Sequence, residues 1–267
     1  MLNKSPVQVW KSNPMCSVRL VCFPYAGGSS SIYSSWWKYL PNDIEVVAIQ
    51  LPGRGTRISE KKLTSVKEII DDLMESIISI SDKPLVFFGH SMGGLVSFEL
   101  ARKLQEENHT IPKHLIISAK QAPHIINSNS EKIHKLPDAD FINKIKEYEG
   151  TPSEMIDNEI FLSYFVPMLR ADFAVSENYT LNSDVKFKNS ITIMGANDDP
   201  FADINRLFEW NAYTEKKCDL HEYTGGHFYY VGKENKFLSD INKVIRKYVL
   251  DDSSCDKNKP ISTGIYT

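Results

Sequence analysis

A serine between glycines is the residue of this chain best suited to carry chemistry. Ser91 lies in the sequence GHSMG (89–93), which follows the apolar run 85–88 and precedes a helical pattern. In that context a G-x-S-x-G turn lifts the serine hydroxyl out of the backbone, and the small glycines leave room for the strained turn. The helix that follows offers free amides to a developing negative charge. We therefore predict that Ser91 is a nucleophile.

A serine hydroxyl needs a neighbouring base, and His227 is the candidate. It lies in TGGHF (224–228), a glycine-containing loop directly after the last predicted strand. Such a loop can bring an imidazole over the serine turn. His90, inside the turn itself, is expected to pack or to orient the turn. The other histidines considered lie in surface-like, pre-strand or strand contexts: His109, His114, His134 and His221.

The base in turn needs an orienting carboxylate, which this chain order places between the serine and the histidine. Two adjacent aspartates follow the preceding strand. Counting from Gly195 favours Asp198. The Asp-Pro dipeptide and the distances along the chain to Trp210 and His227 favour Asp199. We prefer Asp199 and keep Asp198 as the alternative.

A glycine-rich loop, FPYAGGS (23–29), follows the first predicted strand. Such a loop can be a simple turn, or it can supply one of two backbone amides that bind a tetrahedral oxyanion. The second interpretation assigns the oxyanion donors to the backbone of Ala26 and of Met92. A phosphate-binding loop is disfavoured because no GxxxxGK[ST] pattern is present.

Short β-branched and aromatic runs alternate with helical patterns, which predicts a mainly parallel sheet flanked by helices. The predicted strands are Ser17–Pro24, Ile44–Leu51, Leu85–Gly89, His114–Ser118, Ser190–Met194 and Asp219–Tyr223. A helix with a Ser65/Glu68 capping box follows the second strand, and an amphipathic helix over 237–248 closes the pattern. With the serine turn, this order of elements resembles the α/β-hydrolase fold.

We expect a single domain over residues 1–250 with a helical lid inserted at about 127–182. The insertion is rich in apolar and aromatic side chains, and Pro167 is expected to kink or end a helix there. Many of these side chains could simply pack against the body of the domain. Residues 251–267 lack apolar periodicity and are predicted to be a disordered tail.

Composition limits the classes of function. A net charge of -3 gives no reason to expect nucleic acid or a membrane surface as partner. The four cysteines have no metal-ligand spacing, and no segment has the pattern of a signal peptide or a membrane span. We expect a soluble, cytoplasmic protein, a monomer in the simplest case, that needs no metal or organic cofactor.

Several motifs in a fixed order resemble those of the type II thioesterases that accompany nonribosomal peptide and polyketide synthases. They are FPYAGG (23–28), LPGRG (51–55), GHSMGG (89–94), SAKQAPH (118–124), LRADF (169–173) and GGHF (225–228), and the resemblance runs from about Arg19 to Leu250. The chain departs from the family at Lys120, where arginine is more usual, and at the acid loop, which is one residue longer.

The resemblance implies an enzyme that hydrolyses acyl thioesters on the phosphopantetheine arm of acyl- or peptidyl-carrier proteins, removing aberrant or stalled groups. It implies a catalytic triad of Ser91, His227 and Asp199, with oxyanion donors at Ala26 and Met92. Arg54 and Arg170 are typical of the family, and structural ion pairs explain them as well as substrate contacts do. The alternatives are a medium-chain fatty acyl-carrier thioesterase, a general carboxylesterase, and an inactive hydrolase-fold binding module.

Overall fold

A seven-stranded sheet forms the centre of the molecule. The computed structural model describes residues 5–125, 132–146, 158–181 and 183–250. In spatial order the strands are β1 (Val7–Gln8), β3 (Ile44–Ile49), β2 (Val18–Phe23), β4 (Leu85–His90), β5 (His114–Ser118), β6 (Ile191–Ala196) and β7 (Cys218–Tyr223). Every neighbouring pair is parallel except β1 and β3. The predicted mainly parallel sheet is confirmed, whereas β1, with only two residues, was not predicted.

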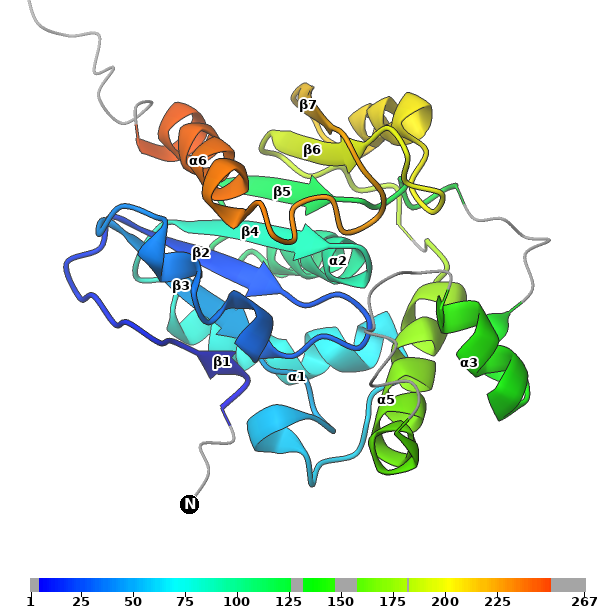
Figure 1. Ribbon diagram of the computed structural model, residues 1–267. Helices are drawn as coiled ribbons and strands as arrows, with labels where there is room; N and C mark the ends of the chain where they lie inside the picture. The colour runs from blue at the N-terminus through cyan, green and yellow to red at the C-terminus, as the bar shows by residue number, and fades with distance from the viewer. Residues whose placement is uncertain (1–4, 126–131, 147–157, 182, 251–267) are drawn as a thin grey trace, which may run out of the picture.

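The register of the parallel strands brings their carboxyl ends to one edge of the sheet. Phe23 pairs with Gly89, His90 with Ser118, and Ser118 with Met194. The loops that follow β2, β4, β6 and β7 therefore emerge at the same edge, toward which the arrowheads of β2, β4 and β5 point in Figure 1. Binding and catalytic groups of parallel α/β sheets gather at this edge.

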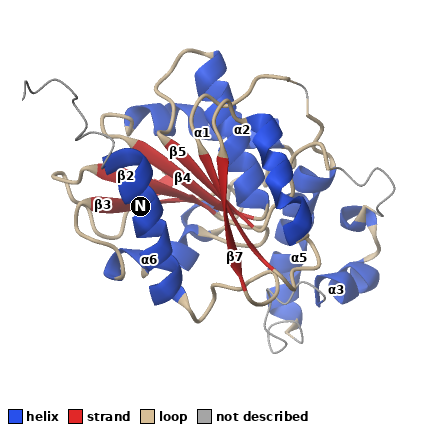
Figure 2. Cartoon of the chain, turned by 90° about the horizontal axis from the view of Figure 1, so that it is seen from above, coloured by secondary structure: helices blue, strands red, loops and turns tan. Residues whose placement is uncertain are grey.

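Helices cover both faces of the sheet. Figure 2 shows α1 (Val66–Ser79) and α2 (Met92–Glu106) on one side and α6 (Glu234–Ile245) on the other. The predicted apolar stripes of α1 and α6 are buried. Short 3-10 turns occur at Ser30–Tyr33, Trp36–Lys38, Gly55–Arg57, Ile133–Lys135 and Ile204–Tyr213, and a π-helical turn at Arg246–Leu250.

Half of the predicted capping box is present at the start of α1. The Ser65 hydroxyl accepts a hydrogen bond from the Glu68 amide at 3.2 Å, as an N-cap should. The Glu68 carboxylate accepts from the Thr64 amide at 2.9 Å. The returning bond of a capping box would instead come from the amide of Ser65. The side chain has reached one residue further back and still satisfies a free donor.

Two helices lie beyond the carboxyl edge of the sheet, within the predicted insertion. They are α3 (Asp138–Lys146) and α5 (Glu159–Glu177), and Figure 1 shows them together at one end of the molecule. They share a small core of buried side chains: Ile133, Phe141, Ile145, Val166 and Leu169. Parts of the insertion, including Tyr148 and Met155, and the whole predicted tail 251–267 lie outside the described residues.

Pro167 was predicted to kink or to end a helix. Helix α5 continues through Pro167, so of these two outcomes the proline does not end the helix. Proline lacks an N–H and therefore leaves the carbonyl four residues earlier without its helical donor. Other contacts of α5 offset this lost hydrogen bond. Its N-terminus is capped by the Asn158 side chain, which accepts from the Phe161 amide at 3.0 Å, and its inner face is anchored by Val166 and Leu169.

His114, expected in a surface-like or pre-strand context, is fully buried as the first residue of β5. Its ring nitrogens lie 3.0 Å from the Ser190 hydroxyl and 2.8 Å from the Thr192 hydroxyl, and its ring stacks on Tyr248. Desolvation by burial lowers the pKa of the imidazole to about 3. The folded protein therefore holds this histidine neutral.

The unfolded chain binds a proton at His114 below pH 6.5, whereas the folded protein does so only near pH 3. The stability that His114 contributes is thus complete above pH 6.5 and is lost as the pH falls. We expect a loss of about 2 kcal/mol between pH 6.5 and pH 5 from this residue, at about 1.36 kcal/mol per pH unit. The free energy of unfolding, measured with urea at both pH values, should fall by correspondingly less in His114→Gln than in wild type. An equal fall in both proteins would show that the pH dependence does not come from His114.

Candidate active site

Ser91 occupies the tight turn between β4 and α2. Its backbone has φ 53° and ψ -118°, a conformation that side-chain-bearing residues rarely adopt. A Cβ on Gly89 would lie 2.2 Å from the Gly93 carbonyl oxygen, and a Cβ on Gly93 would lie 2.2 Å from the Phe23 carbonyl oxygen. The spacing of the glycines around Ser91 therefore has a steric cause, because each glycine lies where the backbone passes too closely for a side chain.

His227 and Asp199 form a buried pair on the loops after β7 and β6. The distance from His227 Nδ1 to Asp199 Oδ2 is 2.8 Å. The other carboxylate oxygen of Asp199 accepts from the amides of Phe201 and Ala202, at 2.8 and 3.2 Å. With Nδ1 facing the carboxylate, Nε2 is the basic nitrogen of the imidazole.

Asp198 is exposed and does not contribute its side chain to this pair. Its backbone amide donates to the Gly225 carbonyl at 3.1 Å, and the Gly225 amide donates to the Asn197 side chain at 3.2 Å. These bonds join the loop after β6 to the loop that carries His227. Of the two aspartates considered, the structure brings Asp199 to the histidine.

Ser91 and His227 line one cavity of about 1280 Å³ at the carboxyl edge of the sheet. Ala26 and Met92 line the same cavity. Met92 is the first residue of α2, so its amide has no acceptor within the helix. Apolar residues of α5 also line the cavity: Phe161, Phe165, Met168 and Leu169. The arrangement can hold an acyl carbonyl near a serine hydroxyl and two backbone donors.

His90 lies buried beneath the serine turn. Its Nδ1 is 2.9 Å from the Ser118 hydroxyl, which lies 2.7 Å from the Tyr229 hydroxyl. Burial, and to a lesser extent the nearby His227, holds the pKa of His90 well below its usual value. A neutral, hydrogen-bonded His90 is consistent with the expected orienting role. Sequence reasoning did not identify Ser118 and Tyr229 as its partners, because neither belongs to a local pattern.

Lys120, the position at which the chain departs from the family pattern, also lines the cavity. Burial lowers the pKa of its ammonium group to about 8, so the group still carries most of its charge at pH 7. The backbone of this residue is fixed by Trp210, whose indole N–H donates to the Lys120 carbonyl at 2.8 Å.

Arg54 and Arg170 both form ion pairs. The Arg54 guanidinium binds both oxygens of Asp172 on α5, each at 2.6 Å, and both side chains are buried. Arg170 donates to the carbonyls of His134 and Leu136 and to the Asp138 carboxylate at 2.6 Å. Arg170 thereby ties α5 to α3 and to the turn before it.

Comparison with known proteins places this site in a family. A family model described as the thioesterase domain matches residues 18–245. The chain is 35% identical over 234 residues to the gramicidin S biosynthesis protein GrsT of Aneurinibacillus migulanus, covering 88% of this chain and 91% of that one. It is 32% identical to the thioesterase PikA5 of Streptomyces venezuelae, over 86% of this chain and 81% of that one.

The solved structure of the type II thioesterase BorB from the borrelidin biosynthetic cluster superposes with a TM-score of 0.81. It is 27% identical, and the match covers 90% of this chain and 97% of BorB. The fold is thus the α/β-hydrolase fold, as predicted. The chain belongs to the thioesterase family, and the predicted resemblance to type II thioesterases is confirmed. No helix in the described parts of the chain is long and apolar enough to cross a membrane.

Proposed function

We propose that this thioesterase removes acyl groups from the phosphopantetheine arms of carrier proteins in nonribosomal peptide or polyketide synthesis, clearing aberrant or stalled units. The observation that carries the proposal is the cavity lined by Ser91 and by His227, whose imidazole is paired with the buried Asp199. The chain is also similar over nearly its whole length to GrsT, PikA5 and BorB. Carrier proteins are the proposed partners. The protein is proposed to act as a cytoplasmic monomer.

The proposed reaction is a two-step acyl transfer. Ser91 gives its proton to Nε2 of His227 and attacks the thioester carbonyl, while the amides of Ala26 and Met92 bind the oxyanion. The C–S bond breaks, and the pantetheine sulfur takes the proton from His227. Water, deprotonated by His227, then attacks the Ser91 ester. The ester C–O bond breaks, Ser91 Oγ takes the proton back from His227, and the carboxylic acid is released. Asp199 holds the imidazole in the required tautomer and stabilises its positive charge.

Acetyl-carrier protein and acetyl-coenzyme A test the carrier proposal, because both present the acyl group on a phosphopantetheine arm. We expect kcat/KM for the carrier-bound group to exceed that for the coenzyme A thioester by at least about tenfold, since only the carrier adds protein contacts. Equal values would refute recognition of the carrier while leaving thioester hydrolysis intact.

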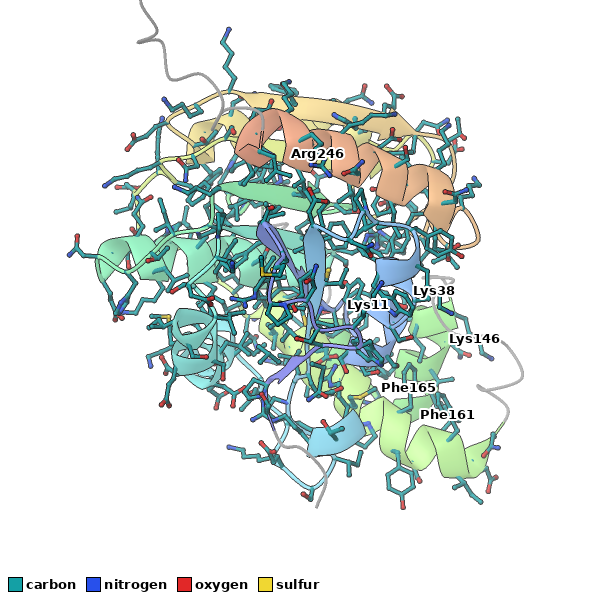
Figure 3. The ribbon with its side chains drawn as sticks, turned by 90° about the vertical axis from the view of Figure 1, so that its left-hand side faces the viewer. Lys11, Lys38, Lys146, Phe161, Phe165 and Arg246 are labelled. Atoms are coloured by element: carbon teal, nitrogen blue, oxygen red, sulfur yellow. The ribbon has the colours of Figure 1, made fainter. Side chains whose placement is uncertain are left out.

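The segment around α3 and α5 is proposed to act as a lid that limits acyl length. Figure 3 shows Phe161 and Phe165 along one side of α5, and their rings stack with centroids 4.8 Å apart. Both side chains line the cavity, whereas Tyr164 of the same helix is exposed. The cavity wall formed by α5 is therefore the surface that a long acyl chain would meet.

Replacing Phe161 by alanine should enlarge the cavity at that wall. We expect kcat/KM for a dodecanoyl carrier relative to an acetyl carrier to rise about tenfold, in line with the free energy of a few buried methylene groups. Tyr164→Ala, which removes an aromatic ring from the outer face of α5, should leave the ratio unchanged. An unaltered chain-length profile in Phe161→Ala would argue against the lid.

The size and apolar wall of the cavity also favour a second candidate, the release of medium-length acyl chains from a fatty-acid synthase carrier. Acyl preference separates the two functions. An editing enzyme should hydrolyse acetyl and aminoacyl carriers at rates comparable to octanoyl or decanoyl carriers. A chain-terminating enzyme should prefer the medium chains strongly.

A further inference from the structure

The oxyanion loop forms a tight turn over residues 25–28. The Gly28 amide donates to the Tyr25 carbonyl at 2.9 Å, and Gly27 has φ +81°. This geometry is typical of a type II turn, with Ala26 at the second position and glycine required at the third. The amide of Gly27 faces away from the hydrogen bond that closes the turn, and it needs a partner of its own.

That partner comes from α5. Asp172 Oδ2 accepts from the Gly27 amide at 2.7 Å, and the Arg54 guanidinium donates to the Gly28 carbonyl at 3.0 Å. Arg54 and Asp172 also bind each other through two bonds of 2.6 Å, with only 4% and 1% of their side chains exposed. A single buried ion pair therefore holds the turn at two adjacent residues, Gly27 and Gly28.

Apolar contacts from the same face of α5 complete the support. A Cβ on Gly27 would lie 3.0 Å from Leu169 Cδ1 and 3.2 Å from Phe165 Cε2. Residues 165, 169 and 172 follow one another at helical spacing, so they face the turn together. The loop that carries Ala26 thus rests on α5 through two apolar side chains and one carboxylate.

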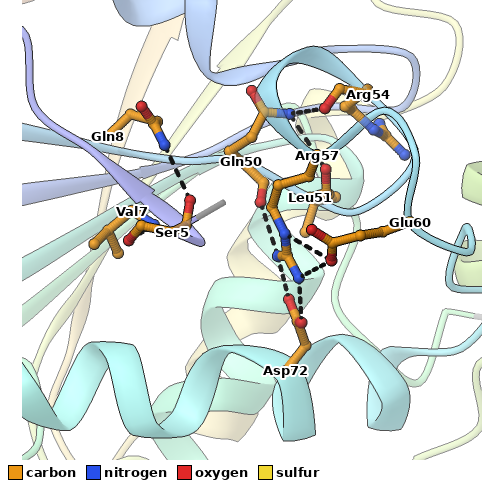
Figure 4. A network of polar contacts seen from close by, with 9 residues as sticks. All are labelled: Ser5, Val7, Gln8, Gln50, Leu51, Arg54, Arg57, Glu60 and Asp72. Atoms are coloured by element: carbon orange, nitrogen blue, oxygen red, sulfur yellow. Dashed lines mark hydrogen bonds and ion pairs between the residues drawn. The ribbon is translucent and has the colours of Figure 1, made fainter. Parts of the chain in front are cut away.

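Arg54 is itself held firmly by the body of the domain (Figure 4). The Gln50 side chain donates to the carbonyl of Arg54 at 3.0 Å. Arg57, three residues on, donates to the Gln50 carbonyl at 3.2 Å and binds both oxygens of Asp72 on α1 at 2.7 and 2.6 Å. The Arg54 guanidinium that binds Asp172 therefore extends from a backbone that hydrogen bonds hold in place.

We infer that Asp172 and Arg54 are positioning residues for catalysis: they fix the oxyanion donor Ala26 and make its placement depend on α5 lying against the turn. The inference rests on the proposed role of Ala26. Oxyanion donors act only when they lie within about 0.5 Å of the required position. Loss of the Arg54–Asp172 pair should therefore lower kcat far more than it weakens substrate affinity.

The double substitution Arg54→Met with Asp172→Leu tests this inference, because it removes the bond to Gly27 without leaving a buried charge unpaired. We expect kcat for an acetyl carrier to fall by about 10–100-fold with little change in KM. The affinity of an alkyl trifluoromethyl ketone, whose adduct with Ser91 carries an oxyanion, should fall by a similar factor. Arg54→Gln with Asp172→Asn should lose less, at most about tenfold, because the asparagine oxygen can still accept from Gly27 although the forked contacts are gone.

A matched control is Arg19→Met with Glu45→Leu. This pair joins the amino-terminal ends of β2 and β3, away from the site, with a bond of 2.7 Å and little exposure. It should change the melting temperature without changing kcat.

If the Arg54→Met/Asp172→Leu protein does not fold, the Arg54→Lys variant is tested instead. Lysine keeps the charge but cannot reproduce the forked contacts, so a fall in kcat of about 3–10-fold is expected.

A folded Arg54→Met/Asp172→Leu protein, or a folded Arg54→Lys protein, with wild-type kcat and wild-type ketone affinity would overturn the inference. Failure of the proposed function looks different, because wild type itself would then leave acyl carriers intact. The same variants measured on an oxygen ester would still test the positioning role in that case.

Discussion

Replacing Ser91 by alanine should reduce kcat for an acyl-carrier thioester by about 10⁶-fold, the loss typical of a nucleophile in a serine triad. The strained turn carries this hydroxyl at a cavity that His227 also lines, and alanine retains the backbone but has no atom to form the acyl-enzyme. The measurement is single-turnover release of acyl groups followed by intact mass. Wild type incubated with an acetyl donor should form an acetyl-enzyme at Ser91, which adds about 42 Da to its mass. This adduct should be absent from Ser91→Ala.

Ser97→Ala is the matched control for this prediction. Ser97 is buried in α2, where its hydroxyl donates to the Gly94 carbonyl at 2.9 Å. We expect its kcat to stay within about twofold of wild type. Residual turnover by Ser91→Ala at more than about one hundredth of the wild-type rate would show that another group attacks the thioester.

Replacing Asp199 by asparagine should lower kcat by about 10⁴-fold, whereas Asp198→Asn should stay within about twofold of wild type. An amide facing Nδ1 stabilises the wrong tautomer of the histidine and cannot stabilise its cationic form. Asp199 is buried 2.8 Å from His227, while Asp198 is exposed. The two neighbouring substitutions thus change the same chemical group in opposite environments.

Steady-state kinetics of both variants on one acyl carrier provide the measurement, and thermal unfolding shows whether each variant folds. Asp199→Asn should keep KM near the wild-type value, because the carboxylate orients the base and does not bind substrate. A larger loss in Asp198→Asn than in Asp199→Asn would contradict the pairing in the structure.

Local sequence patterns were enough to predict most of the fold. Five of the six parallel strands are short, mainly apolar runs bounded by turn residues, a signal that is read from the local sequence alone. The sixth, β7, is more polar and only partly buried. Strand β1 gave no such signal, because two half-buried residues pair with the edge of β3. Pro167 does not end α5, because tertiary packing of the helix outweighs the local cost of a missing hydrogen bond.

The site was predictable wherever one residue stood in a distinctive turn, as Ser91 and His227 do. The choice between Asp198 and Asp199 was harder because β6 continues to Ala196, two residues past the predicted end, which displaces the count from Gly195. The contact between Arg54 and Asp172 joins residues 118 positions apart. No local pattern pairs them, so their shared role at the oxyanion loop required the structure.

The most direct test compares acetyl-, octanoyl- and aminoacyl-loaded carrier proteins with a simple oxygen ester, using wild type beside Ser91→Ala. Intact mass of the carriers reports the loss of each acyl group. Rapid loss from the carriers with wild type alone, and slow turnover of the ester, is the predicted result. Rapid ester hydrolysis with untouched carriers would contradict the proposed function and indicate a general carboxylesterase. No turnover of either substrate would indicate a binding module without catalysis.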